Sequence, residues 1–181
     1  VMYEANCIIF DGSDAALFDE TRPFMPPATQ DEALARLCGL VQECARVNAP
    51  YIELADLGAG TGRVALPLAR HYARYRERYR TVPKLRITCV DLSDEMLGRL
   101  RERWAVEGEH VKESVELIAE CALDVRDLGG LAPRFDAAIA HWIFHLIEDW
   151  RLAVYAIDQV IRPSGRLFLF TEHSSLYSAI D

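Results

Sequence analysis

The stretch "ELADLGAGTGRVALPLAR" (residues 53–70) joins a strand-like segment to a helical one through three glycines. The apolar run ends in Asp56, and Gly58, Gly60 and Gly62 follow at alternate positions. Glycine tolerates positive φ and has no Cβ, so a turn of this kind lets a ligand approach the backbone. A tight turn with a purely structural role is the alternative. We predict that this turn is a binding loop.

Short apolar runs alternate with helical patterns on both sides of this loop. Strands separated by helices imply right-handed crossovers and a parallel sheet. We therefore predict a doubly wound α/β fold with helices on both faces of the sheet. The expected strands are 51–56, 85–91, 114–121, 135–141 and 165–172, and the expected helices are 28–47, 61–80, 93–108 (with Ser93 as N-cap) and 150–162.

Composition limits the function classes that this chain can serve. The chain has 181 residues with no internal repeat, which suits one domain, and we divide it into an N-terminal helical extension or lid (1–50) and a core (51–181). The net charge of -8 makes a nucleic-acid partner improbable. No apolar run approaches the roughly 20 residues that cross a membrane. Five scattered cysteines without a CxxC pair predict reduced thiols in a cytoplasmic protein.

The residues just after each predicted strand carry the information about the ligand, because doubly wound sheets bind ligands at the strands' carboxyl ends. A dinucleotide loop reads G-x-G-x-x-G, but its third glycine would fall at Arg63, so the spacing is G-x-G-x-G. Asp91 follows the second strand, where a carboxylate can accept hydrogen bonds from a ribose. Asp124 follows the third strand, where it could meet an adenine edge. A helix-capping acid and a solvated loop acid, respectively, are the alternatives.

Three histidines near the carboxyl ends of the predicted strands are candidate general bases. His141 ends the fourth strand, His145 follows four residues later, and His173 comes after the fifth strand. Imidazole titrates near neutral pH and suits proton transfer. His145 could instead be packed in an apolar segment. We expect no metal site, because Trp142 stands where the H-E-x-x-H zinc motif has its Glu.

In combination, "DLGAGTGR", "VDLSDEML", "LDVRDL", "FDAAIAHWIFHLIEDW" and "IRPSGRLFLF" resemble the motifs of the class I S-adenosylmethionine-dependent methyltransferases. The resemblance covers about residues 50–172 and implies a Rossmann-like, mostly parallel sheet in the order 3-2-1-4-5. It implies that the family's usual C-terminal antiparallel strand pair is missing from this sequence. The cofactor would be S-adenosyl-L-methionine. The implied cofactor-binding residues are Asp56, Gly58, Gly60 and Gly62 at the methionine end, Asp91 on the ribose, Leu92, Asp124 and Val125 at the adenine, and His141 near the amino-acid part.

The N-terminal stretch "DAALFDETRPF" (14–24) resembles the YD-x-x-RP segment that precedes the core in small-molecule members of that family. The resemblance implies a lid over cofactor and substrate. Phe18, Asp19 and Arg22 are then pocket candidates, and Arg22 could pair with an anionic substrate group. A packed N-terminal helix is the alternative.

The sequence thus predicts a methyltransferase that moves a methyl group from S-adenosylmethionine to a small molecule by in-line displacement. An NAD(P)-dependent Rossmann oxidoreductase and a non-catalytic interaction module of the same fold are the alternatives. Along the segment 70–80, arginines share one face of the predicted helix and tyrosines line another, a mixture that could bind nucleic acid or another partner. We favour a solvated arginine face with the tyrosines packed on the protein or on a second subunit, which leaves a homodimer open.

Overall fold

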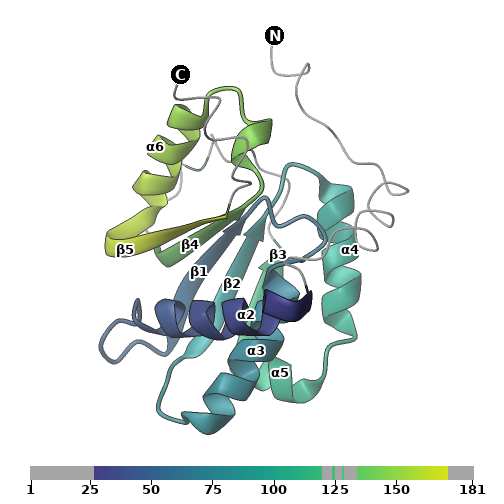
Figure 1. Cartoon of the computed structure of the whole chain (residues 1–181), viewed down its shortest axis with the longest axis vertical. Helices are drawn as coiled ribbons and strands as arrows, with labels where there is room; N and C mark the ends of the chain where they lie inside the picture. Colours follow the sequence, from purple (N-terminus) through teal and green to yellow (C-terminus); the bar gives the residue numbers. More distant parts are fainter. Residues whose placement is uncertain (1–26, 120–123, 125–127, 129–133, 171–181) are drawn as a thin grey trace.

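The computed structural model describes residues 27–119, 124, 128 and 134–170, and a five-stranded sheet forms its centre (Figure 1). The described strands all pair in parallel, in the spatial order β3-β2-β1-β4-β5. The predicted doubly wound α/β class and the order 3-2-1-4-5 are confirmed. All carboxyl ends therefore meet at one edge. The strands are β1 (Tyr51–Leu57), β2 (Lys84–Val90), β3 (Val115–Ala119), β4 (Phe135–His141) and β5 (Ile161–Phe170).

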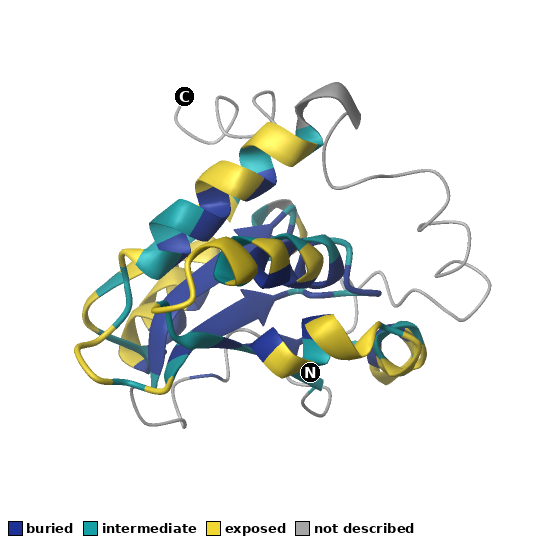
Figure 2. Cartoon of the chain, turned by 90° about the horizontal axis from the view of Figure 1, so that it is seen from below, coloured by how far each residue is buried: buried dark blue, intermediate teal, exposed yellow. Residues whose placement is uncertain are grey.

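Helices cover both faces of the sheet, and the two faces have separate apolar cores. One core joins the sheet to α2, α3, α4 and α5, and the other joins it to α6. Figure 2 shows the buried strands between helices whose outer sides are exposed. The helices are α2 (Pro27–Gln42), α3 (Ala65–Arg78), α4 (Asp94–Ala105), α5 (Glu109–Ser114) and α6 (Trp150–Val160), with a short 3-10 helix η2 (Phe144–Leu146).

Alternation along the strands decides which side chains share a face. Leu54 of β1 packs in the core with α2 and α3, whereas the next residue, Ala55, packs in the core with α6. Asp56, two residues after Leu54, therefore lies on the α3 face. By the same alternation Ile139 and His141 of β4 lie on that face.

Helix α3 begins at Ala65, four residues later than predicted, because the glycine turn occupies the residues before it. Gly60 and Gly62 have positive φ and cannot join a right-handed helix. The turn is closed by the Gly62 N–H, which donates to the Ala59 carbonyl at 2.9 Å. Helix α4 follows the prediction closely, since the Ser93 side chain accepts from the Met96 N–H at 3.3 Å as its N-cap.

Two other elements differ from the sequence-based expectation. The six-residue α5 lies between the predicted helix 93–108 and the predicted strand 114–121 and includes the first residue of that strand, and its N-cap, Gly108, offers no side-chain signal. Strand β5 begins at Ile161, not at 165, and its pairing with β4 shifts register between Phe135 and Ala137. Ser164, at φ +70°, lies in this irregular part.

At the amino end of the sheet, Asp136 of β4 ties three segments together. Its carboxylate accepts hydrogen bonds from Arg46 and Arg162, both at 2.8 Å, and from the Glu53 N–H at 2.9 Å. The side chain is almost fully buried. A buried carboxylate is stable only when its acceptor positions are used, and here the protein itself supplies the donors. This network is structural and lies opposite the predicted site.

Candidate functional site

The three glycines of the binding loop have different surroundings. Their φ angles are +68°, +54° and +87° for Gly58, Gly60 and Gly62. A Cβ on Gly58 would lie 2.0 Å from Ile143 Cγ2, and one on Gly62 would lie 2.4 Å from Leu100 Cδ1. A Cβ on Gly60 would meet nothing closer than 3.7 Å. Gly58 and Gly62 thus serve packing within the protein, whereas a Cβ on Gly60 would make only an ordinary van der Waals contact with Met96 and would clash with nothing.

Asp91 connects this loop to the end of β2. Its Oδ2 accepts the Gly60 N–H at 2.7 Å, and its Oδ1 accepts the Ser93 N–H at 2.9 Å. Burial raises the pKa of Asp91, and the backbone hydrogen bonds counteract that rise. The Leu92 N–H donates to this carboxylate as well. Because a carboxylate has about four acceptor positions, Asp91 can still accept a hydrogen bond from a ligand hydroxyl.

Asp56 lies beside it at the end of β1 and is only 1% exposed. The Ala65 N–H donates a hydrogen bond to this carboxylate, but Oδ2 has no hydrogen-bond partner among the described residues. Burial is the larger cause, and the negative charge of Asp91 the smaller one, of a rise in the pKa of Asp56 to about 7. A buried acceptor without a donor costs free energy unless a ligand supplies one. A cationic donor such as an ammonium group is the best complement.

Aromatic side chains line the other half of the same edge. His141, 8% exposed, stacks on the neighbouring Trp142 at 5.0 Å between ring centroids, and Phe170 of β5 packs against it at 6.0 Å. The Arg63 guanidinium lies 5.3 Å from the centroid of the Trp142 ring. Trp142 has φ +54°, which is rare for a bulky residue, and strain of this kind clusters at functional sites.

Comparison with known proteins identifies the family. A family model described as a methyltransferase domain matches residues 55–167, which is more than half of the chain. The chain belongs to the methyltransferase-domain family. Its fold is that of the class I S-adenosylmethionine-dependent methyltransferases. A search of curated proteins found no match.

Solved structures similar to this methyltransferase domain include three that illustrate the range of the fold. A Methanococcus maripaludis protein assigned as an S-adenosyl-L-methionine-dependent methyltransferase has 16% identity and a TM-score of 0.59 over 88% of this chain and 63% of its own. The [4+2]-cyclase SpnF has 26% identity and a TM-score of 0.50 over 75% and 43%. The trans-methyltransferase CalH, in complex with S-adenosylhomocysteine, has 18% identity and a TM-score of 0.52 over 77% and 37%. The chain thus spans about a third to two thirds of these proteins.

The structure describes some of the remaining predicted site residues and not others. Leu92, next to Asp91, is 45% exposed, as an apolar contact for a ligand would be, and Asp124 is half-buried. The backbone of His145 lies in η2, but its side chain is outside the description. Also outside the described residues are Val125, His173 and the lid candidates Phe18, Asp19 and Arg22.

Sequence reasoning did not assign Arg63 and Trp142 to the site. Arg63 was noted only as the residue that replaces a third glycine, and nothing in the sequence signals the left-handed backbone at Trp142. Across the described ranges, no group of three or more metal-ligating side chains comes together. None of the helices that the structure describes combines the length and the apolar character needed to cross a membrane.

Proposed function

We propose that this methyltransferase domain binds S-adenosyl-L-methionine and transfers its methyl group to a small-molecule acceptor. The observation that carries the proposal is the buried Asp56 Oδ2, which has no partner among the described residues and lies beside a loop whose central glycine, Gly60, could carry a Cβ without a clash. A cofactor with a cationic ammonium group, a ribose and no pyrophosphate fits these groups.

The cofactor-binding residues act by orientation. Asp56 would accept a hydrogen bond from the ammonium group of the methionine part. Asp91 would bind the ribose with the acceptor capacity that the Gly60, Leu92 and Ser93 N–H groups leave free. The exposed Leu92 would contact the adenine. When bound, S-adenosylmethionine supplies an activated methyl group on a sulfonium.

On the acceptor side, the chain contributes a proton acceptor and a dry environment. His141 is buried between Trp142 and Phe170, so water has little access to its ring. An acceptor hydroxyl that loses its proton as it attacks the methyl carbon, or an ammonium that must lose a proton before it can attack, would pass that proton to this imidazole. Alignment of the two reactants provides most of the rate, as expected when the transferred carbon is already activated.

Titration calorimetry with S-adenosylhomocysteine and with NAD tests the proposal. We expect the wild-type protein to bind S-adenosylhomocysteine and not NAD. Asp91→Ala removes an acceptor for Gly60, Ser93 and the ribose, and it should weaken binding about 100-fold, since hydrogen bonds to charged groups contribute about 1.5–3 kcal/mol each. The matched control is Asp94→Ala, which removes an exposed carboxylate paired with Arg101 and should bind as wild type does.

The outcomes distinguish this proposal from its rivals. Binding of NAD alone would indicate an oxidoreductase, and binding of neither would indicate an interaction module. Binding of the product without methyl transfer to any acceptor would indicate another chemistry on the same fold. A cytoplasmic location, a homodimer and a lid formed by residues 1–50 stay predictions.

A further inference from the structure

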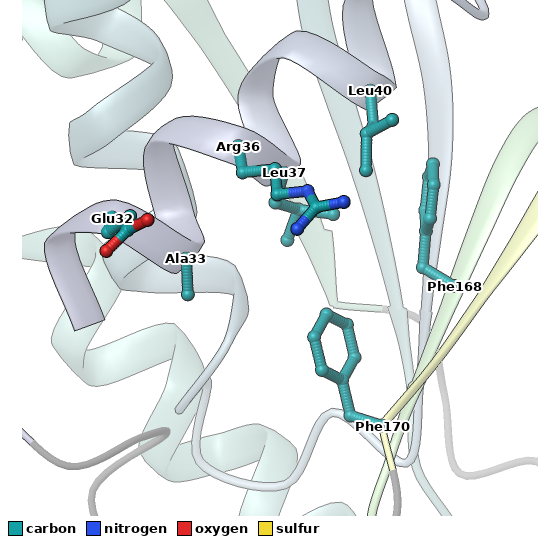
Figure 3. Close-up of a pocket in the computed structure, with 7 residues that line it drawn as sticks. All are labelled: Glu32, Ala33, Arg36, Leu37, Leu40, Phe168 and Phe170. Atoms are coloured by element: carbon teal, nitrogen blue, oxygen red, sulfur yellow. The ribbon is translucent and has the colours of Figure 1, made fainter. Parts of the chain in front are cut away.

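A groove of about 400 Å³ lies between α2 and the end of β5 (Figure 3). Its apolar lining comes from one side of α2 and from two alternate residues of β5, and two charged side chains, Glu32 and Arg36, complete it. Binding sites for small molecules are commonly 300–1,000 Å³, mostly apolar, with few polar groups. The apolar lining consists of Ala33, Leu37, Leu40, Phe168 and Phe170.

The groove adjoins the candidate site through Phe170. This ring belongs to the groove and also packs against His141 at 6.0 Å. The Phe170 carbonyl accepts the Trp142 N–H at 3.0 Å, which joins the ends of β4 and β5. Phe168 and Phe170 pack on the core that contains α2 and α3, so the groove lies on the same face of the sheet as Asp56. The groove is therefore a neighbour of His141 across the Phe170 ring.

The charges of the groove favour an anionic ligand. Figure 3 shows the Arg36 guanidinium extending toward the side of the groove formed by Phe168 and Phe170, with Glu32 apart from it at the rim. In the part of the chain that the structure describes, no carboxylate forms an ion pair with Arg36. Guanidinium groups bind carboxylates in a bidentate manner and also stack on planar rings.

We propose that this groove binds the non-reacting part of the methyl acceptor, an apolar and preferably aromatic acid whose carboxylate pairs with Arg36. That the bound acid is the methyl acceptor rests on the proposed function. That the groove binds an apolar acid does not depend on it. The protein's net charge of -8 disfavours anions in general. The preference of the groove for an anionic over a neutral ligand therefore depends on the Arg36 guanidinium.

Calorimetric titration of the full chain with 2-naphthoate, and with the neutral 2-naphthylmethanol of similar shape, tests the proposal. We expect 2-naphthoate to bind the wild type more tightly than the alcohol does. Arg36→Gln should weaken the acid about 10-fold and leave the alcohol unchanged, because only the acid forms the charged hydrogen bonds. Arg80→Gln, at an exposed arginine in the turn after α3, is the matched control and should leave both affinities unchanged.

Phe168→Ala is a second variant that should weaken the acid and the alcohol alike, with circular dichroism confirming that the protein is folded. Equal binding of acid and alcohol, equal effects of Arg36→Gln and Arg80→Gln, or no binding at millimolar concentration would overturn the proposal. So would sedimentation showing a dimer that Phe168→Ala dissociates, because a second copy would then occupy the groove. Titration of each variant with S-adenosylhomocysteine reports separately on the proposed function, and Arg36→Gln should not change it.

Discussion

Two buried aspartates on neighbouring strands, Asp136 and Asp56, lie at opposite ends of the sheet in opposite surroundings. Asp136 accepts hydrogen bonds from two arginines and a backbone N–H. Asp56 accepts one from Ala65, has an oxygen without a described partner, and has a pKa raised to about 7. The difference separates a structural end, where the protein completes its own interactions, from a ligand-binding end, where an acceptor remains available.

The largest expected loss of stability follows from removing the structural aspartate. Asp136→Ala leaves Arg46, Arg162 and the Glu53 N–H without their acceptor, and we expect a loss of about 3 kcal/mol in the free energy of unfolding. At about 2–4 °C per kcal/mol for a chain of this size, Tm should fall by about 6–12 °C. Thermal unfolding followed by circular dichroism measures this.

Glu43→Ala is the control for that measurement, since it breaks an exposed ion pair with Arg166 and should cost less than about 1 kcal/mol. If the two variants lose the same stability, the amino-end network does not hold the fold together.

Within the binding loop, Gly58 serves packing and Gly60 lies on the proposed ligand side, so alanine should cost different amounts of stability at the two positions. Gly58→Ala combines a left-handed backbone with a clash at Ile143, and we expect it to lose about 2–3 kcal/mol of stability. Gly60→Ala carries only the backbone cost of about 1–2 kcal/mol, because its Cβ would meet Met96 at an ordinary contact distance and clash with nothing. Urea unfolding gives both values. Equal losses would show that a Cβ at Gly60 meets a clash in solution.

A pH dependence of stability is expected from Asp56. Because its pKa is raised from 3.8 to about 7 in the folded protein, the folded state binds more protons than the unfolded state between these values. The stability of the ligand-free protein should therefore fall as pH rises from about 4 to about 7. Asp56→Asn should flatten this dependence, leaving the part due to Asp91, whose pKa is also raised. At about 1.4 kcal/mol per pKa unit, we expect a gain of up to about 4 kcal/mol over the wild type at pH 8, which raises Tm.

Thermal unfolding at several pH values between 4 and 8 measures this dependence. Asp94→Asn, at an exposed carboxylate, should retain the wild-type profile. If Asp56→Asn shows the same pH dependence of Tm as the wild type, burial does not raise the pKa of Asp56.

The cofactor side of the site could be predicted from sequence because its signals are local. Parallel strands bring their carboxyl ends together, so a glycine loop after β1 and Asp91 after β2 had to be neighbours, and the 2.7 Å contact between Gly60 and Asp91 follows. The strand order came from the family resemblance and not from periodicity.

The acceptor side and the amino-end network could not be predicted, because they depend on residues distant in sequence. Nothing in "FDAAIA" indicates that Asp136 would meet Arg46 and Arg162, and the groove requires α2 to face Phe168 and Phe170. The six-residue α5 was missed because its glycine N-cap resembles a loop. The start of β5 was missed because Pro163 and Gly165 are typical of a turn.

A crystal structure of the protein with S-adenosylhomocysteine tests the central claim most directly. We predict that the ammonium group of the homocysteine part lies within hydrogen-bonding distance of Asp56 Oδ2 and that the ribose binds Asp91. A product molecule bound elsewhere, or bound at the loop with Asp56 Oδ2 still lacking a partner, would contradict the account.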